Sequence, residues 1–251
     1  SRAAVHVFFA ERATRKVPGL PAGTEPRPVR KGGVIGAGTM GGGIAICFAN
    51  AGLPVTLLDA SAEGLQKGLA TIEKTFDSMV KRGRLSPEDK AKRLALIRGS
   101  LDYADLADAD VVIEAVFEDM ALKKKIFAEL DRVTKPGTVL GTNTSSLDID
   151  EIATAKKRPE DVIAKTSPAT IRTAMELAKP LKKTPVLVKV CYGFVGNRMM
   201  EGYAREAERI VLEGATPRQV DAALEHWGMA MGILAVFDMA GIDVGVKMHA
   251  A

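Results

Sequence analysis

Val34-Ile35-Gly36-Ala37-Gly38-Thr39-Met40-Gly41 decides the fold of this chain, together with Asp59, which follows the last glycine by 18 residues. A short apolar strand leads into Gly-x-Gly-x-x-Gly. A helical pattern then leads to a second apolar strand at 55–58, which ends at the acid. Strand, glycines, helix, strand and acid in this order are typical of a dinucleotide-binding unit. The alternative is a glycine-rich turn that merely packs.

Each glycine has a separate task in such a unit. Gly36 permits the tight turn, Gly38 lets the backbone approach a pyrophosphate, and Gly41 lets the helix pack close to the strand. The helix that begins near Thr39 directs unpaired N–H groups and the positive end of its dipole at the phosphates. We therefore expect this loop to bind a cofactor through Gly36, Ala37, Gly38, Thr39, Met40 and Gly41.

Asp59 favours NAD over NADP. A carboxylate at this position accepts hydrogen bonds from the adenosine ribose and repels a 2′-phosphate. No arginine follows directly, because the next residues are Ala60 and Ser61. The glycine fingerprint alone leaves FAD open.

The composition predicts an aliphatic α/β protein, since 47% of the 251 residues are hydrophobic and only 5% aromatic. The sequence contains no run of about eighteen uncharged apolar residues, so we do not expect a membrane span. Cys47 and Cys191 lack metal-type spacing, so we expect no metal site and a reduced, intracellular compartment. We expect this compartment to be the bacterial cytoplasm in preference to the peroxisome, a choice that the cysteines do not decide.

The net charge of +4 is spread along the chain. The basic stretches at 123–125 and 179–183 are interpreted first as solvated helix faces and second as cations facing the phosphates of a substrate such as coenzyme A. No basic stripe is interleaved with aromatic residues, so we expect no nucleic-acid partner.

The chain divides into three predicted parts. Residues 1–31 combine an amphipathic helix at 3–16 with a proline-rich linker that we do not expect to pack within the next domain. Residues 32–192 alternate apolar strands and amphipathic helices, which predicts a doubly wound, Rossmann-type parallel sheet. Residues 193–251 show helical patterns only, and predict a smaller, truncated all-helical domain for substrate binding or dimerisation; a homo-oligomer is possible.

The expected strands of the sheet lie at 33–36, 54–58, 111–115, 138–142 and 186–190. The expected helices lie at 39–51, 61–82, 87–95, 120–133 and 168–180, and those of the last part at 196–213 and 217–227.

Two polar clusters follow predicted strands, where ligands bind in open α/β sheets. In the first, Glu118 is either an acid near a helix N-terminus or part of a loop whose Val116 and Phe117 backbone passes the nicotinamide ribose. In the second, residues 141–146 either cap the next helix or bind the substrate hydroxyl and the nicotinamide region through Asn143 and Ser145.

A third cluster, residues 193–198, lies at the predicted domain junction. Asn197 is there either a helix cap or a substrate contact. Hydride transfer from an alcohol also needs a general base, which is usually histidine at neutral pH. The chain has only His6, His226 and His249, and none follows a predicted strand near the nicotinamide. The sequence thus has a cofactor site and no evident catalytic base.

Five stretches together resemble the L-3-hydroxyacyl-CoA dehydrogenases of multifunctional fatty-acid β-oxidation enzymes. They are residues 34–44, 112–119, 142–147, 191–199 and 239–245. The resemblance covers essentially the whole chain. Residues 8–21 also look like the helix and linker that follow an enoyl-CoA hydratase part in those enzymes, which implies such a domain upstream.

The resemblance implies NAD-dependent oxidation of an (S)-3-hydroxyacyl-CoA to the 3-ketoacyl-CoA, and the reverse reaction. It implies NAD contacts from Met40, Asp59, Lys123 and the loop of Val116, Phe117 and Glu118. Ser145 would lie at the cofactor and the substrate hydroxyl, and Asn197 at the substrate. Weaker candidates for the CoA phosphates are Lys74, Lys81 and Arg82.

The resemblance also exposes a gap. The family's catalytic histidine and the glutamate that orients it would fall between Ala164 and Lys165, where about twenty residues, the length of an active-site segment, are absent. Three explanations stay open. The segment is disordered and missing from the printed sequence, or it was deleted by engineering, or the chain is a natural non-catalytic relative. Two rival functions also stay open: another β-hydroxyacid dehydrogenase of similar fold, and an NAD-binding scaffold protein.

Overall fold

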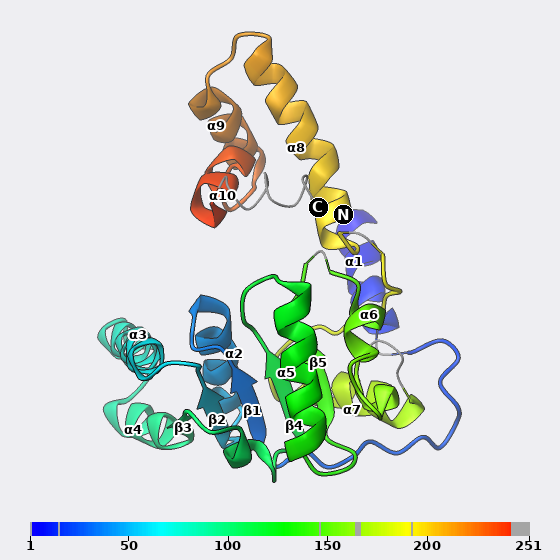
Figure 1. Cartoon of the computed structure of the whole chain (residues 1–251). Coiled ribbons are helices and arrows are strands. Elements are labelled where there is room, and N and C mark those ends of the chain that lie inside the picture. The colour runs from blue at the N-terminus through cyan, green and yellow to red at the C-terminus, as the bar shows by residue number, and fades with distance from the viewer. Residues whose placement is uncertain (1, 15, 146, 164–166, 192, 242–251) are drawn as a thin grey trace. The chain divides into compact units, whose positions relative to one another are not determined.

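The computed structural model describes residues 2–14, 16–145, 147–163, 167–191 and 193–241. The chain divides into two compact units, residues 1–190 and 191–251 (Figure 1). Each unit has a hydrophobic core of its own.

The first unit is built on a five-stranded parallel sheet with the strand order β3-β2-β1-β4-β5. Its strands are β1 (Gly32–Ile35), β2 (Val55–Leu58), β3 (Ile97–Ser100), β4 (Val111–Glu114) and β5 (Val139–Thr142). Its helices are α1 (Arg2–Ala13), α2 (Thr39–Asn50), α3 (Ala62–Lys81), α4 (Pro87–Ala95), α5 (Met120–Val133), α6 (Ile149–Ala153) and α7 (Pro168–Leu177), with 3-10 turns η1 (Tyr103–Leu106) and η2 (Pro159–Asp161). The predicted doubly wound sheet is confirmed.

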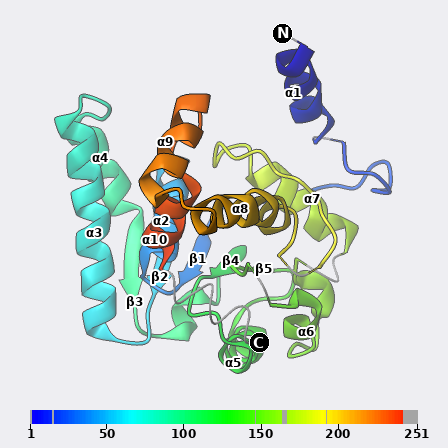
Figure 2. The same cartoon turned by 90° about the horizontal axis from the view of Figure 1, so that it is seen from above.

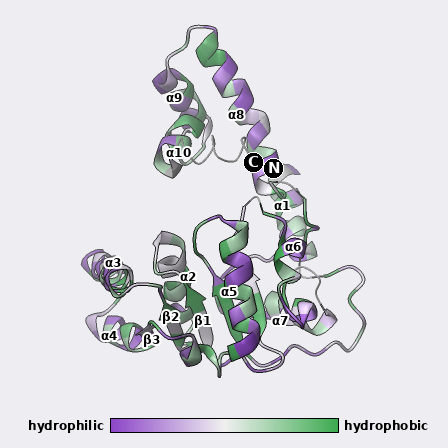
Figure 3. Cartoon of the chain, in the orientation of Figure 1, coloured by the Kyte–Doolittle hydropathy of each residue, from purple (hydrophilic) through white to green (hydrophobic). Residues whose placement is uncertain are grey.

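Alternate residues of each strand face opposite sides of the sheet, as the pleat requires. Val34 and Leu57 belong to the core that includes residues of α2 and α3, whereas Ile35 and Leu58 belong to the core that includes residues of α5 and α6. The view in Figure 2 accordingly shows α5 on one side of the sheet and α2 and α3 on the other. In Figure 3 the central strands are mostly hydrophobic, and the face of α5 turned towards the viewer is largely hydrophilic.

One predicted strand was wrong and one strand of the sheet was missed. The apolar run at 186–190 has no regular structure, and Val186, Leu187 and Val188 are exposed, because no strand pairs with this run among the described residues. Strand β3 was not predicted, since Arg98 and Gly99 break its apolar pattern. As an edge strand it depends on backbone pairing with β2 rather than on buried side chains.

The end of the linker packs on the first unit, contrary to the expectation. Val29 lies against the core of α2 and α3. The backbone N–H groups of Arg30 and Lys31 donate to Asp110, at 2.7 and 3.1 Å. Since Asp110 directly precedes β4, the linker is fixed at the amino edge of the sheet.

The second unit contains α8 (Gly196–Leu212), α9 (Pro217–Trp227) and α10 (Ile233–Ala240), of which α10 was not predicted. Thr216 and Gln219 form a capping box at the start of α9. The carboxylate of Asp221 accepts hydrogen bonds from the N–H groups of Leu234 and Ala235, which fastens α10 to α9. Within the described residues, no helix is long and apolar enough to cross a membrane.

Candidate cofactor site

The carboxyl ends of four strands stand in one row. Ile35 is in register with Leu58 on one side and with Glu114 on the other, and Glu114 is in register with Thr142. The sequence clusters that follow these strands therefore meet at one edge of the sheet. The strand order reverses between β1 and β4, which is the switch point where ligands bind in such sheets.

The glycine loop has the geometry that its sequence predicts. Gly36 has φ of +97°, a region that side chains rarely adopt, and a Cβ there would lie 2.5 Å from the carbonyl oxygen of Ala115. A Cβ on Gly41 would lie 1.8 Å from the carbonyl oxygen of Gly36. The turn and the close approach of α2 to β1 thus both require glycine.

The N-terminus of α2 has the features of an anion site. Its N-cap is Gly38, and no side chain caps the helix. A Cβ on Gly38 would meet nothing within 4 Å, so the space beside the loop is open. The first N–H groups of a helix lack partners within it and carry the positive end of its dipole. A pyrophosphate fits this arrangement.

Asp59 stands at the end of β2, beside the glycine loop. Its Oδ2 accepts a hydrogen bond from the N–H of Ala37 at 2.8 Å, and its Oδ1 accepts one from the N–H of Ser61 at 3.1 Å. A carboxylate has about four acceptor positions. Asp59 can therefore hold the loop and still accept hydrogen bonds from ribose hydroxyls.

Helix α3 forms a wall of the site that the sequence analysis passed over. A Cβ on Gly64 would lie 2.7 Å from Oδ1 of Asp59, and a Cβ on Gly68 would lie 2.4 Å from the carbonyl oxygen of Ala37. The two glycines stand four residues apart, so they share one helix face. That spacing was the available signal for close contact between α3 and the loop.

The pocket over this edge has a volume of about 1510 Å³. Typical small-molecule sites have about 300–1,000 Å³, so the space suits a molecule as long as a dinucleotide. Its lining runs from the glycine loop and Asp59 across to Val116, Phe117 and Asn143. It also includes Lys67 on α3, a residue that was not predicted to belong to the site.

Tyr103 also lines this pocket. Burial raises the pKa of its hydroxyl, and the charges of Glu129 and Glu114 add to the effect. Tyr103 therefore stays protonated at neutral pH.

The loop after β4 presents backbone and an exposed ring. Phe117 is 85% exposed, and the N–H of Val116 donates to Oε1 of Glu114 at 2.7 Å. Glu118 directly precedes Asp119, the N-cap of α5, so it lies near the helix N-terminus without capping it. Instead, Oε1 of Glu118 accepts hydrogen bonds from Oγ1 of Thr144 at 2.5 Å and from the N–H of Ser145 at 3.0 Å.

Glu114 and Lys123 form a buried ion pair beneath these loops, and neither side chain is exposed. The ammonium of Lys123 lies 2.8 and 2.9 Å from the two oxygens of Glu114, 3.4 Å from the carbonyl oxygen of Asn143, and 3.6 Å from Oε2 of Glu118. Glu114 was assigned no role from the sequence. A carboxylate that ends a buried strand nine residues before a lysine on the next helix was the signal.

The loop after β5 carries Asn143 and Ser145. The N–H of Asn143 donates to the carbonyl oxygen of Glu114 at 2.7 Å. Helix α6 is capped by Asp148, so the hydroxyl and amide cluster does not cap it. Ser146 lies outside the described residues.

Three sequence-predicted cations of the first unit lie outside this pocket. Lys74, Lys81 and Arg82 are exposed at α3 and do not line it. Asn197 is half-buried in the first turn of α8, whose N-cap is Val195, so it is not the helix cap. Its predicted contact with substrate stays a prediction.

Neither of the two histidines that the structure describes is among the residues that line the pocket. His6 and His226 are exposed on α1 and α9, and His249 lies outside the described residues, as do Ala164 and Lys165 beside the expected catalytic segment. In the part of the chain that the structure describes, no group of three or more metal-ligating side chains comes together.

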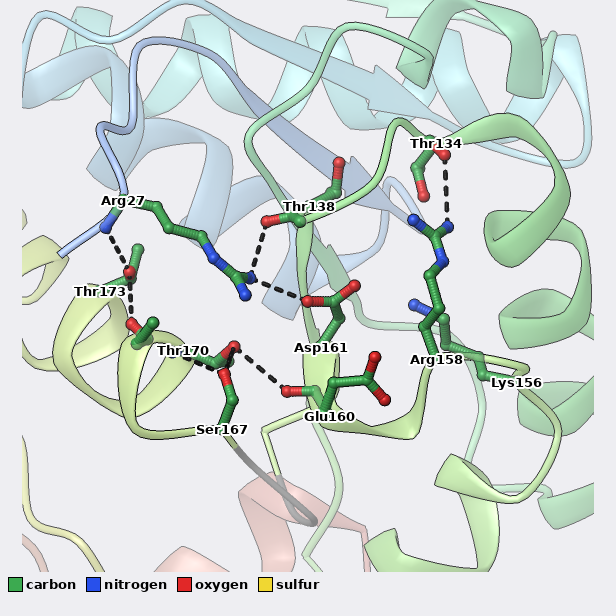
Figure 4. Close-up of polar contacts among 12 residues, drawn as sticks. Arg27, Thr134, Thr138, Lys156, Arg158, Glu160, Asp161, Ser167, Thr170 and Thr173 are labelled. Atoms are coloured by element: carbon green, nitrogen blue, oxygen red, sulfur yellow. Dashed lines mark hydrogen bonds and ion pairs between the residues drawn. The ribbon is translucent and has the colours of Figure 1, made fainter. Parts of the chain in front are cut away.

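A second polar cluster lies at the amino edge of the sheet (Figure 4). Arg27 donates to Oδ1 of Asp161 at 2.8 Å and to the carbonyl oxygen of Gly137 at 2.9 Å. Lys156 is buried, and its ammonium, 3.8 Å from Oδ1 of Asp131, has no hydrogen-bond partner among the described residues. Burial lowers the pKa of Lys156, which the charges of Asp131 and Asp161 oppose only in part.

Both units match models of one family. Residues 31–165 match the model described as 3-hydroxyacyl-CoA dehydrogenase, NAD binding domain. Residues 193–250 match the model described as 3-hydroxyacyl-CoA dehydrogenase, C-terminal domain.

Individual relatives of the chain are also enzymes or subunits of fatty-acid oxidation or bifunctional type, by their names. The chain is 41% identical to the peroxisomal bifunctional enzyme of Cavia porcellus, over 99% of the chain and 37% of that protein. It is 38% identical to fatty acid oxidation complex subunit alpha of Shewanella baltica, over 99% of the chain and 38% of that protein. The chain thus spans little more than a third of these relatives.

A solved structure is also similar. The crystal structure of (S)-3-hydroxybutyryl-CoA dehydrogenase from Ralstonia eutropha has a TM-score of 0.81 and 34% identity, covering 88% of this chain and 86% of that one.

Proposed function

Because this chain belongs to the 3-hydroxyacyl-CoA dehydrogenase family, we propose that it is the dehydrogenase part of a multifunctional fatty-acid β-oxidation enzyme. The reaction would oxidise an (S)-3-hydroxyacyl-CoA to the 3-ketoacyl-CoA with NAD, and run in reverse with NADH. The observation that carries this proposal is the pocket whose lining joins the glycine loop and Asp59 to Val116 and Asn143.

The residues of this pocket fit NAD. Bound NAD supplies the acceptor for the hydride that leaves the substrate carbon. The N–H groups at the start of α2 would bind its pyrophosphate, and Asp59 would accept hydrogen bonds from the adenosine ribose. Val116, Phe117 and Glu118 would line the nicotinamide side, with Lys123 beneath them.

The remaining roles concern the substrate. Ser145 would orient the reacting hydroxyl, and Asn197 would bind the substrate from the second unit. Holding the reacting groups in position is what makes such a transfer fast. Lys74, Lys81 and Arg82 stay weaker candidates for the CoA phosphates.

Oxidation of the hydroxyl also releases a proton, which a general base must accept as the hydride leaves. The alignment with the Cavia porcellus enzyme extends over 273 positions, whereas this chain has 251 residues. At least 22 aligned positions therefore have no residue in this chain. This difference supports the inference that the segment with the histidine and its glutamate is absent between Ala164 and Lys165.

The full protein is a further part of the proposal. The bifunctional relatives support an enoyl-CoA hydratase domain upstream of this chain in its parent protein. A homo-oligomer stays a prediction. So does a bacterial cytoplasmic location, with the peroxisome as the alternative, since the relatives' names include a peroxisomal enzyme and a subunit from Shewanella baltica.

Intact mass followed by an assay tests the proposal. A mass of 26.7 kDa identifies the chain without the segment. That chain should bind NADH but reduce acetoacetyl-CoA about 10²–10⁴ times more slowly than a chain with the segment restored, because it lacks the general base. Inserting the missing segment of about twenty residues, with its histidine and glutamate, between Ala164 and Lys165 should restore turnover.

Two results would contradict the proposal. A restored chain that binds NADH and does not reduce acetoacetyl-CoA would favour an NAD-binding scaffold. A chain that oxidises 3-hydroxy acids without coenzyme A at least as well as the thioester would favour another β-hydroxyacid dehydrogenase.

A further inference from the structure

Glu114 connects three segments of the chain. Its Oε1 accepts hydrogen bonds from the N–H of Val116 at 2.7 Å and from Lys123 at 2.8 Å. Its Oε2 accepts from Lys123 at 2.9 Å and from Oγ1 of Thr142 at 2.6 Å. One carboxylate thus links the loop after β4, the first turns of α5 and the end of β5.

Lys123 extends this connection to the loop after β5. Its ammonium contacts the carbonyl oxygen of Asn143 at 3.4 Å and Oε2 of Glu118 at 3.6 Å. Glu118 in turn accepts the N–H of Ser145 at 3.0 Å. The charges of Glu114 and Lys123 therefore lie beneath both loops. Glu118, within the loop after β4, connects Lys123 to the loop after β5.

These two loops receive one half of a dinucleotide. The cofactor crosses the switch point between β1 and β4. The glycine loop and Asp59 lie on β1 and β2, so they bind the adenosine side, and the loops after β4 and β5 are left for the nicotinamide side. Among the described residues, the hydrogen bonds of the Glu114 carboxylate come from the second group of loops, from the end of β5 and from Lys123.

A buried ion pair is weak support for stability, because desolvation opposes the attraction between the charges. In some proteins such a pair is retained because it specifies one arrangement of its neighbours. Within the described residues, the hydrogen bonds to the Glu114 carboxylate come from Val116 and Thr142 at the strand ends beside the pocket and from Lys123, the lysine that contacts Asn143.

We infer that Glu114 is a positioning residue for the nicotinamide half of the cofactor: through Val116, Thr142 and Lys123 it holds the loops after β4 and β5 in one arrangement. It does not touch the cofactor itself. This inference rests on the NAD binding proposed above.

The test compares a whole cofactor with half of it. Binding of NADH and of ADP-ribose is measured by calorimetry on the same preparations of the chain. Glu114→Gln should raise the Kd for NADH at least 10-fold and change the Kd for ADP-ribose less than 2-fold, because the adenosine contacts lie on β1 and β2. The nicotinamide fluorescence of bound NADH gives an independent readout, and should fall with the loss of a fixed ring environment.

Two further variants complete the design. Glu151→Gln removes the matching carboxylate from an exposed pair, since Glu151 lies 2.6 Å from Lys124 of the same helix α5. It should leave both affinities unchanged. Thr142→Val is isosteric, removes only the 2.6 Å hydrogen bond to Glu114, and should weaken NADH about threefold, as expected for one hydrogen bond of modest net strength. If Glu114→Gln does not fold, the NADH affinity of Thr142→Val tests the positioning role instead.

The outcomes separate this inference from the proposed function. Equal losses for NADH and ADP-ribose, or no loss for either, would overturn the positioning role. A wild-type chain that binds neither ligand would overturn both proposals. If the wild-type chain binds NADH and the restored chain does not reduce acetoacetyl-CoA, the proposed function fails while the binding comparison still decides the role of Glu114.

Discussion

Oδ2 of Asp59 accepts a 2.8 Å hydrogen bond from the N–H of Ala37, so the acid at the end of β2 fixes the glycine loop at the end of β1. The same carboxylate is the group that reads the ribose in the proposed site. Cofactor choice and loop geometry therefore depend on one side chain.

Asp59→Asn should weaken NADH binding about 10-fold and bring the affinities for NADH and NADPH closer together. The amide keeps an acceptor for Ala37 but loses the charge that strengthens the ribose hydrogen bonds and repels a 2′-phosphate. Fluorescence titration with both cofactors measures the change. Asp89→Asn on α4, an exposed acid outside the pocket, is the control; an unchanged preference in Asp59→Asn would contradict the assigned role.

Gly68→Ala should lower the free energy of unfolding by about 1–2 kcal/mol. Its Cβ would lie 2.4 Å from the carbonyl oxygen of Ala37, and such overpacking costs more than the helix propensity of alanine returns. Gly202→Ala in α8 meets nothing within 4 Å and should instead stabilise its unit slightly. Urea denaturation of both variants measures the contrast, and stabilisation by both would disprove the close packing of α3 on the loop.

Arg27→Ala should cost about 2 kcal/mol of stability, because it leaves the buried carboxylate of Asp161 without its arginine. Arg30→Ala removes an exposed arginine from the same segment and should change stability by less than about 0.5 kcal/mol. Adding Asp161→Asn to Arg27→Ala should recover part of the loss. Similar effects of the two arginine variants in thermal unfolding would argue against a fixed linker.

Lys156→Met should raise the free energy of unfolding by about 1 kcal/mol at neutral pH, because the buried ammonium has no hydrogen-bond partner among the described residues. The lowered folded-state pKa means that the unfolded chain binds more protons as the pH approaches the ordinary value of 10.5. The wild type therefore gains stability in that window, and the advantage of the variant should shrink.

The exposed neighbour provides the control for this measurement. Lys157→Met should be neutral at every pH, since Lys157 lies at the surface. An advantage of Lys156→Met that grows towards pH 10.5 would show that the sign of the shift is wrong.

The sequence predicted the parallel sheet and the glycine loop, because periodicity and glycine spacing are local signals. It missed β3, whose Arg98 and Gly99 hide an edge strand held by backbone pairing. It also predicted a strand at 186–190 from apolar residues alone, although a strand needs a partner. The Glu114–Lys123 pair went unassigned, because only the fold brings a strand end and a helix turn together.

The attachment of the linker has a mechanical consequence. Residues 27–31 are bound to groups that precede β4 and β5, on the edge of the sheet opposite the pocket. Tension transmitted along the chain from its N-terminal side would therefore reach β1 and the amino edge first. Fusions and tethers joined ahead of α1 should consequently pull on the rigid base of the sheet and leave the loops that receive the cofactor unstrained.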